Sequence, residues 1–546
     1  MRAKRWGAAL LVAAVVGATA CGSGGDDSTA DGTVADATTV QASQPPGSDD
    51  AATASTDPSG PEPGGAASTE VTGTIRVGTY LYPPGLDPHT ATGGQPTIQY
   101  LQPVYDSLLR RNPDFTFSPM VATAWQYTDD TNTTLEMTIR DDVVFSDGTP
   151  LDAEAVKANL ERALEKQGDF VRYLAGLERV DVVDPTTVVL HLSAPSPTLE
   201  LGLSGPAGML VSPAAFDNPD LDTNPVGSGP YTFDAGSFVD GSSWAYDAKD
   251  DYWAPELIGP ARLELTLITD PEARFNALTS GQIDIALGSV DQVDAARAAG
   301  LDVTEFDVDW QGLMLMDRGG EMTPALGDVR VRQALNYAVD RQTLVDAVLG
   351  GQGTATDQIF PASSYAYVPE LEGTYDYDPD RARQLLADAG YADGFTLRTP
   401  SVPALNTFVE AIGGYLSDIG VTLQIDTVET GFVAAVISGD YDAPVMSFGM
   451  EHPYADAQIL LVPGATFNPF GTDDPEIDRL LSEAASLPTD EATEKYREIG
   501  RIVHDDAWFL PIYRPAGVYF TNPAVSNFEV YQLQAAPAIY GWKIDG

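Results

Sequence analysis

The second half of the chain contains the stretch Asp328-Val329-Arg330-Val331-Arg332-Gln333-Ala334-Leu335-Asn336-Tyr337-Ala338. Its apolar residues recur three and four positions apart, which is the spacing of one face of an α-helix. Aspartate is favoured immediately before the first turn of a helix, and glycine is favoured just after the last turn. We therefore predict one long helix that begins at Asp328 and ends at Gly350-Gly351.

Helices and short strands alternate on the C-terminal side of this stretch. The predicted helices begin at Asp378, Leu405, Asp474 and Thr489, and a strand is predicted over Val421–Ile425. Alternation of this kind predicts an α/β fold. Because 546 residues exceed what one compact core usually holds, we expect at least two lobes.

The charge balance excludes one class of partner. The chain has 80 acidic and 29 basic residues, for a formal net charge of −51. Such a surface repels the phosphates of nucleic acid, so we expect no nucleic-acid binding. Hydrophobic residues make up 43% of the chain, enough to build substantial cores.

The N-terminus has the pattern of a secretory signal. Basic residues at Arg2, Lys4 and Arg5 precede a short apolar run, and Cys21 is the only cysteine of the sequence. This pattern predicts a secretory signal peptide over residues 1–20. The single cysteine at the cleavage point resembles the lipobox of bacterial lipoproteins, which implies a lipoprotein signal peptide and lipidation of Cys21, and thereby an anchor outside the cytoplasm on the cell membrane. The alternative is plain signal cleavage that leaves an unmodified cysteine. Residues 21–72 are rich in Gly, Ser, Thr, Ala, Asp and Pro, which predicts a disordered acidic tether.

No pattern in the sequence indicates catalysis, a metal or a cofactor. The four histidines, His89, His191, His452 and His504, are far apart and lack the spacing of zinc ligands. There is no Gly-x-Ser-x-Gly motif of a serine hydrolase. We therefore predict a protein that is not an enzyme and has no cofactor or metal site.

The loop Phe448-Gly449-Met450-Glu451-His452-Pro453-Tyr454 follows a predicted strand and has a mixed character. It places the carboxylate of Glu451 among apolar side chains, where a ligand's ammonium group would find a partner after it leaves water. The alternative is an ordinary strand-to-helix connection with a solvated glutamate.

Several short motifs, taken in order, resemble one family over about residues 73–546. They are Leu86-Asp87-Pro88, Ile139-Arg140-Asp141 through Leu151, Pro225-Val226-Gly227-Ser228-Gly229-Pro230-Tyr231, Ser280-Gly281-Gln282-Ile283-Asp284, Asp328 through Ala338, and Tyr377-Asp378-Pro379 through Tyr391. The family is that of the bacterial extracellular solute-binding proteins of the peptide/nickel class, which are receptors of ABC importers. The position of Cys21 is also typical of such a receptor.

The resemblance implies a type II periplasmic-binding-protein-like fold with two α/β lobes joined by a hinge. The extended first lobe would comprise residues 73–308 and return at 509–546, and residues 309–508 would form an inserted second lobe. A solute would bind between the lobes and stabilise their closed arrangement. The resemblance also implies a monomer that delivers its solute to the ABC permease of a membrane importer.

The family's binding site corresponds to two segments of this chain. The resemblance places Thr92, Gly93 and Gly94 on one side of the ligand and Phe448, Gly449, Met450 and Glu451 on the other, with Glu451 at the position that binds a peptide's α-ammonium group. An oligopeptide is therefore the expected solute. The loop departs from the family's usual sequence at His452-Pro453-Tyr454-Ala455, which leaves open a metal chelate, an opine, a sugar or another non-peptide solute. A sensory lipoprotein that presents a ligand to a partner is a further alternative.

Overall fold

The computed structural model describes residues 72–544 except 93, 307–308, 488 and 532–535; the side chains of 489 and 490 are also not described. The predicted signal peptide, Cys21 and nearly all of the predicted tether lie outside the described residues. Within the described residues, no helix is both long and apolar enough to cross a membrane.

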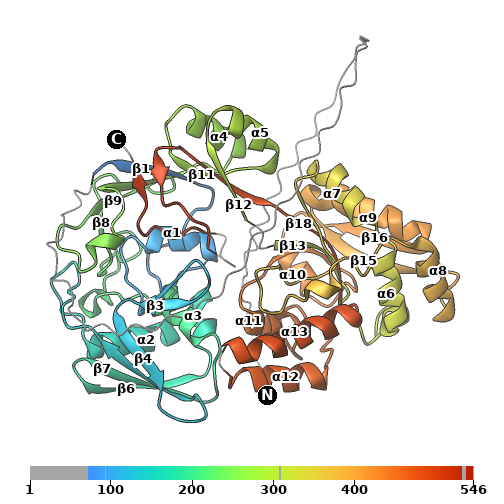
Figure 1. Cartoon of the computed structure of the whole chain (residues 1–546), viewed down its shortest axis with the longest axis horizontal. Helices are drawn as coiled ribbons and strands as arrows, with labels where there is room; N and C mark the ends of the chain where they lie inside the picture. Colours follow the sequence, from blue (N-terminus) through green and yellow to red (C-terminus); the bar gives the residue numbers. More distant parts are fainter. Residues whose placement is uncertain (1–71, 93, 307–308, 488, 532–535, 545–546) are drawn as a thin grey trace, which may run out of the picture. The chain divides into compact units, whose positions relative to one another are not determined.

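A seven-stranded sheet organises the first part of the fold (Figure 1). Its strand order is β12 (Asp302–Phe306), β19 (Gly517–Thr521), β11 (Ile285–Leu287), β1 (Thr74–Thr79), β10 (Arg262–Leu267), β9 (Ser243–Ala248) and β8 (Tyr231–Phe233). Strand β1 lies parallel to β10 and β11, and the other pairs are antiparallel. We call residues 72–306 and 517–544 the first lobe.

The first lobe also contains an antiparallel four-stranded sheet and a hairpin. The sheet has the order β4 (Ala122–Tyr127), β5 (Thr134–Ile139), β7 (Thr187–Leu192) and β6 (Leu177–Asp184). The hairpin pairs β2 (Leu109–Arg111) with β3 (Phe117–Pro119), and a terminal pair joins β20 (Val525–Ser526) to β21 (Lys543–Ile544). The helices of this lobe are α1 (Ile98–Leu101), α2 (Ala153–Lys166), α3 (Leu199–Leu203), α4 (Pro271–Thr279) and α5 (Val293–Ala298).

A second four-stranded sheet organises residues 309–515, which we call the second lobe. Its order is β14 (Gly353–Ala355), β18 (Phe509–Pro515), β13 (Asp309–Met314) and β17 (Val445–Gly449). A parallel pair, β15 (Phe395–Ser401) and β16 (Val421–Thr427), lies beside helices. The helices are α6 (Val329–Tyr337), α7 (Arg341–Leu349), α8 (Pro379–Asp388), α9 (Asn406–Asp418), α10 (Phe432–Val436), α11 (Pro453–Leu460), α12 (Pro475–Ala484) and α13 (Thr489–Asp505).

The chain passes between the two lobes twice, once between Phe306 and Asp309 and once between Pro515 and Gly517. Strand β18, which begins at Phe509, pairs with β13 and β14 and is therefore part of the second sheet. The change of sheet on the return lies after Pro515, later in the chain than the residue 509 expected from the resemblance. The two crossings begin side by side, since Phe306 pairs with Gly517.

The predicted long helix from Asp328 to Gly350 is wrong, because the structure divides it into α6 and α7. Asp340 interrupts the helix: its side chain accepts a hydrogen bond from the backbone N–H of Thr343 at 3.0 Å and begins a second helix. Arg341 then donates to the carbonyl oxygens of Pro511 and Tyr375, at 2.8 and 2.9 Å. These contacts account for the break, which the apolar periodicity does not reveal.

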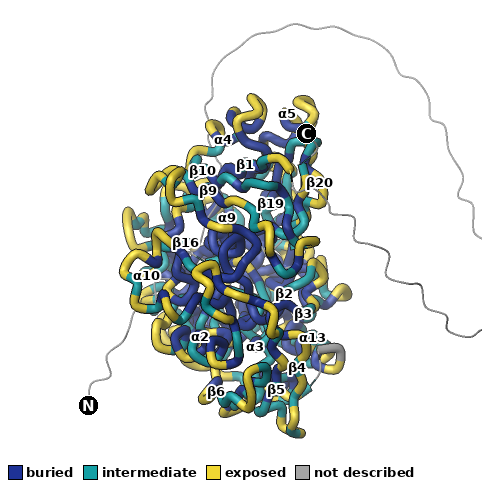
Figure 2. The backbone as a smooth tube through the Cα atoms, turned by 90° about the vertical axis from the view of Figure 1, so that its left-hand side faces the viewer, coloured by how far each residue is buried: buried dark blue, intermediate teal, exposed yellow. Residues whose placement is uncertain are grey.

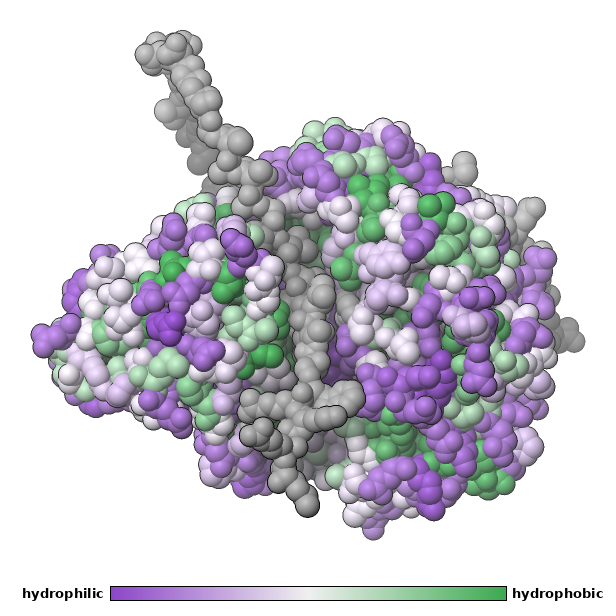
Figure 3. Space-filling view, turned by 180° about the vertical axis from the view of Figure 1, so that it is seen from behind, coloured by the Kyte–Doolittle hydropathy of each residue, from purple (hydrophilic) through white to green (hydrophobic). Residues whose placement is uncertain are grey.

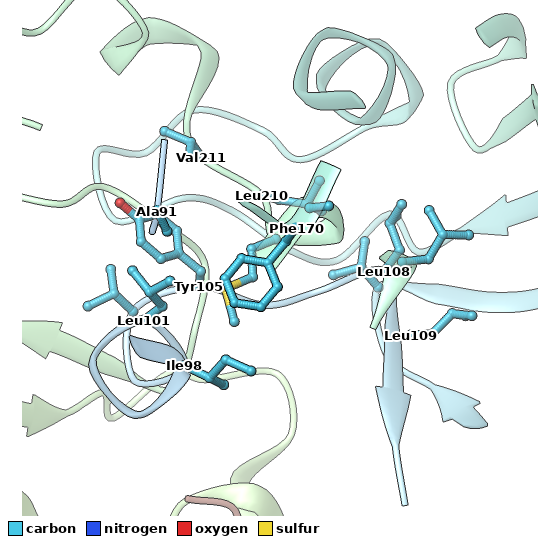
Figure 4. Close-up of a cluster of buried hydrophobic side chains, with 14 of the residues drawn as sticks. Ala91, Ile98, Leu101, Tyr105, Leu108, Leu109, Phe170, Leu210 and Val211 are labelled. Atoms are coloured by element: carbon cyan, nitrogen blue, oxygen red, sulfur yellow. The ribbon is translucent and has the colours of Figure 1, made fainter. Parts of the chain in front are cut away.

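Each lobe has its own apolar core. Figure 2 shows buried segments inside the folded part and exposed segments along its outline. In the first lobe one part of the core gathers side chains from α1, from the start of β2 and from the 3-10 helix Asp169–Leu174 (Figure 4). Ile98, Leu101, Leu109 and Phe170 are all buried in it. The same packing brings the polar neighbours of these apolar residues around one cavity.

Hydrophilic residues are prominent over the face of the folded part seen in Figure 3, with smaller apolar patches among them. This distribution agrees with the high content of acidic residues in the sequence.

Candidate functional site

A residue next to the first predicted segment contacts the second predicted segment in the structure. Gln95 follows directly on Thr92–Gly94, and its Nε2 donates a hydrogen bond to Oε1 of Glu451 at 2.8 Å. Gln95 belongs to the first lobe and Glu451 to the second, so this bond joins the lobes. Glu451 thus lies between the lobes and is not a freely solvated residue of a surface loop, since its side chain is 18% exposed.

The carboxylate of Glu451 has further partners from the first lobe. The hydroxyl of Tyr173 donates a hydrogen bond to Oε2, and Nη2 of Arg172 lies 3.4 Å from the same oxygen. Arg172 also donates to the Tyr173 hydroxyl at 2.6 Å. In this arrangement a cation and two polar groups already satisfy the negative charge of Glu451, and a ligand's ammonium group would have to replace or join them.

The first-lobe side of the site is held by backbone hydrogen bonds. The N–H groups of Gly168 and Asp169 donate to the carbonyl oxygens of His89 and Ala91, each at 3.1 Å. They fix the segment that carries Arg172 and Tyr173 against the segment that leads to Gln95. A Cβ on Gly168 would lie 2.6 Å from the oxygen of His89, so this close approach requires glycine.

The predicted first segment has an irregular backbone. Thr92 is exposed, and its carbonyl oxygen accepts a hydrogen bond from the hydroxyl of Thr97 at 2.8 Å. Gly94 has a φ of +68°, which only glycine adopts without strain, and open space surrounds the position of a Cβ. Gly93 lies outside the described residues. The role of Thr92, Gly93 and Gly94 in binding stays a prediction.

The predicted second segment divides into core residues and one polar residue. Phe448 and Met450 are 5% and 1% exposed and belong to the apolar core of the second lobe, where Phe448 packs edge-to-face on Phe467 at 5.1 Å. Gly449 pairs with Asp309, and a Cβ there would lie 2.8 Å from Asp309 Oδ1. Contact of these three residues with a ligand stays a prediction.

The direction of the Glu451 side chain is set by the start of α11. Its backbone N–H donates to Oδ1 of Asp456 at 3.0 Å, and the Nδ1 of His452 accepts from the N–H of Tyr454 at 3.2 Å. Burial, followed by the negative charge of Glu451, raises the pKa of Asp456 well above its usual range. The loop is therefore anchored by its own helix.

A cavity of about 40 Å³, open to solvent at its mouth, lies beside Glu451. Among its described lining residues, Glu451 is the one residue from the second lobe and the one carboxylate. The remaining polar lining is from the first lobe and includes Gln95, Gln102, Arg110, Arg111 and Tyr173. Apolar contacts come from Ile98 and Phe170 (Figure 4), so the cavity combines an apolar wall with a few polar groups, as ligand sites commonly do.

Arg110 and Arg111 are site residues that the sequence analysis did not find. They are consecutive basic residues at the end of β2. Arg111 is partly buried, and its guanidinium carbon lies 4.1 Å from the centre of the Phe115 ring. Burial lowers the pKa of Arg111 to about 10, although Glu451 and Tyr365 oppose the shift, so this group stays protonated at neutral pH.

The comparisons with known proteins agree with this two-lobed geometry. A family model described as bacterial extracellular solute-binding proteins, family 5, matches residues 116–467. The chain belongs to this family. Its members are solute-binding components of ABC importers, and the resemblance drawn from the sequence motifs is confirmed.

Individual relatives have different ligands in their names. The chain is 29% identical over 438 residues to the glutathione-binding protein GsiB of Salmonella paratyphi A, a match that covers 75% of this chain and 82% of the relative. It is 27% identical over 515 residues to heme-binding protein A of Haemophilus influenzae, covering 85% and 91% of the two chains.

Among solved structures, HbpA2 from Haemophilus parasuis has a TM-score of 0.76 at 22% identity and covers 87% of this chain and 100% of that one. The predicted fold class is confirmed: the protein is a two-lobed α/β solute-binding protein with a type II periplasmic-binding-protein-like fold.

The buried imidazole of His452 predicts a pH dependence of stability. Burial, helped by the charge of Arg111, lowers the pKa of His452 from 6.5 to about 4. The unfolded chain therefore binds more protons than the folded protein between these pH values, and stability falls as the pH falls through this window. The contribution of His452 to this loss is at most about 3 kcal/mol.

The measurement compares urea unfolding of the wild type and of His452→Asn at pH 7 and at pH 4. Asparagine also accepts a hydrogen bond at the start of a helix, and all other titrating groups are shared by the two proteins. We expect the stability advantage of the wild type to shrink toward pH 4. An advantage of equal size at both pH values would show that His452 does not titrate in this window.

Proposed function

We propose that this chain is the receptor component of an ABC importer, anchored outside the cytoplasm by a lipid on Cys21, and that it carries a small peptide between its two lobes to a membrane permease. Membership of the solute-binding family supports the receptor role. The lipid anchor rests on the signal-like N-terminus and the single cysteine.

The position of Glu451 is the observation that carries the peptide proposal. Its carboxylate is contributed by the second lobe to a cavity whose other described lining residues are from the first lobe. A free α-ammonium group would pair with this carboxylate while the rest of the peptide contacts the first lobe. A ligand held by both lobes stabilises the closed arrangement over the open one, which is the event that a permease can recognise.

A non-peptide solute is the second candidate, and the two arginines of the cavity favour it. A metal chelate or an opine offers several carboxylates, which guanidinium groups bind well. Such a ligand would need no ammonium group to pair with Glu451.

Isothermal titration calorimetry tests the peptide proposal. The probes are glutathione, which is the ligand named for one relative, a mixture of dipeptides and tripeptides, and the N-acetylated form of each peptide that binds. We expect binding of free-amine peptides and at least tenfold weaker binding of the acetylated forms. Mass spectrometry of the solute that the purified protein retains is the independent measurement. A retained non-peptide solute together with no peptide binding would reject the peptide proposal and favour the second candidate.

A further inference from the structure

The cavity beside Glu451 has a sign of charge opposite to that of the whole chain. The protein has a formal net charge of −51, with 29 basic residues among 546. Two of these bases, Arg110 and Arg111, line the same cavity, and a third, Arg172, lies next to its carboxylate. The cavity therefore has a local excess of positive charge in a chain whose net charge is strongly negative.

The single carboxylate among the described lining residues does not cancel this charge. Glu451 is within 3.4 Å of Arg172 and accepts hydrogen bonds from Gln95 and Tyr173. Among the described lining residues, Arg110 and Arg111 against Glu451 leave two positive charges and one negative charge. Low-dielectric walls such as Ile98 and Phe170 strengthen the field that these charges place inside the cavity.

The arginines are also held in position. Arg110 and Arg111 end strand β2, which pairs with β3 through Arg110↔Ser118 and Arg111↔Phe117. The buried Leu109 fixes the start of the same strand in the core, and the ring of Phe115 lies beneath the Arg111 guanidinium. A guanidinium fixed on a strand, beside a cavity, is suited to bind a carboxylate through two parallel hydrogen bonds.

We propose that Arg110 and Arg111 form an anion subsite of the cavity and that the solute carried by this protein bears at least one carboxylate. This inference rests on the proposed receptor function and narrows its solute class. It is compatible with a peptide, whose C-terminal carboxylate would lie at the arginines, and equally with an acidic solute that has no amino group.

The burial of the Arg111 guanidinium has an electrostatic cost. A charged guanidinium partly removed from water loses hydration, and this loss is reflected in its pKa of about 10. The favourable interaction with a bound carboxylate would offset this loss of hydration.

The experiment pairs two ligands with two variants in calorimetric titrations at low ionic strength. The ligands are glutathione and its diethyl ester, which keeps the amine and removes both carboxylate charges. The variants are Arg110→Met, which deletes one guanidinium of the subsite, and Arg179→Met. Arg179 is an exposed arginine of β6 that pairs with Asp181 and is not among the described residues that line the cavity.

We expect the ester to bind at least tenfold more weakly than glutathione to the wild type. Arg110→Met should weaken glutathione binding by a similar factor and leave ester binding unchanged, and Arg179→Met should affect neither. Equal binding of acid and ester, or an equal effect of Arg110→Met on both, would overturn the anion subsite. A melting temperature close to that of the wild type establishes that Arg110→Met is folded.

If glutathione does not bind, the solute retained by the purified protein replaces it and is identified by mass spectrometry. A peptide without any carboxylate, such as one with an amidated C-terminus and no acidic side chain, overturns the anion subsite and leaves the proposed peptide receptor standing. An acidic solute without an amino group supports the anion subsite and rejects the peptide. The two proposals therefore fail in distinguishable ways.

Discussion

Replacement of Arg162 by methionine is expected to lower the free energy of unfolding by about 3–5 kcal/mol, because it leaves a buried carboxylate without its cation. Nη1 and Nη2 of Arg162 donate to the two oxygens of Asp87, at 2.8 and 2.6 Å. Both side chains are 7% exposed. Burial opposes ionisation of Asp87, but the hydrogen bonds and charge of Arg162 outweigh it and hold the pKa of Asp87 below its usual value.

The same arginine extends the network to His89. Nη1 of Arg162 lies 2.9 Å from His89 Nδ1, and His89 Nε2 lies 3.1 Å from the carbonyl oxygen of Met209. With the imidazole neutral, Nδ1 accepts from Arg162 and Nε2 donates to Met209. The variant would therefore also leave Nδ1 without this donor, in the segment that leads to Gln95.

Urea unfolding followed by tryptophan fluorescence measures the effect of Arg162→Met. Arg179→Met is the control, since loss of an exposed pair changes stability by only about 0–1 kcal/mol. Asp87→Asn and the double variant complete a thermodynamic cycle, from which the coupling between the two side chains follows. A loss below about 1 kcal/mol in Arg162→Met would contradict the importance of this buried pair.

Replacement of Glu451 by alanine is expected to weaken the binding of free-amine peptides by about 2–5 kcal/mol if the proposed ammonium pair is buried. Glu451 is the one second-lobe residue among the described lining residues of the cavity, so loss of its carboxylate removes both an ionic partner and a contact across the lobes. Calorimetric titration of the wild type and the variant with the same peptide measures the difference.

Two controls separate the charge of Glu451 from its other contacts. Glu451→Gln keeps the size of the side chain and an oxygen that accepts from Gln95, and it removes the charge. We expect it to lose most of the affinity for free-amine peptides and little for their N-acetylated forms. Equal affinity of the wild type for free and acetylated peptides would remove Glu451 from the ammonium-binding role.

Local sequence patterns predicted many elements correctly because their signals lie within a few residues. The helix expected from Leu405 to Ile419 is α9 (Asn406–Asp418), and the strand expected over Val421–Ile425 is β16 (Val421–Thr427). In both cases an apolar periodicity is bounded by a glycine, Gly420. The long helix predicted from Asp328 is interrupted at Asp340. The apolar periodicity continues through this position, and hydrogen bonds of the tertiary structure cause the break.

The candidate site was predictable only in part. The mixed character of Phe448–Tyr454 drew attention to Glu451, which does lie at the cavity between the lobes. Nothing local distinguishes Phe448 and Met450, which pack into the core, from residues that would face a ligand. No sequence motif identifies Arg110 and Arg111 as site residues. They line a cavity that exists only in the folded protein, where β2, α3, the segment around Tyr173, and Tyr540 near the C-terminus come together.

The sequence by itself determined the α/β class, the family and a carboxylate of interest, because these depend on periodicity and on the order of short motifs. Only the tertiary structure decided to which lobe β18 belongs, which residues surround Glu451 and where basic side chains cluster. The physical reason is that strand pairing and electrostatic fields arise between segments hundreds of positions apart, as in the bond between Gln95 and Glu451.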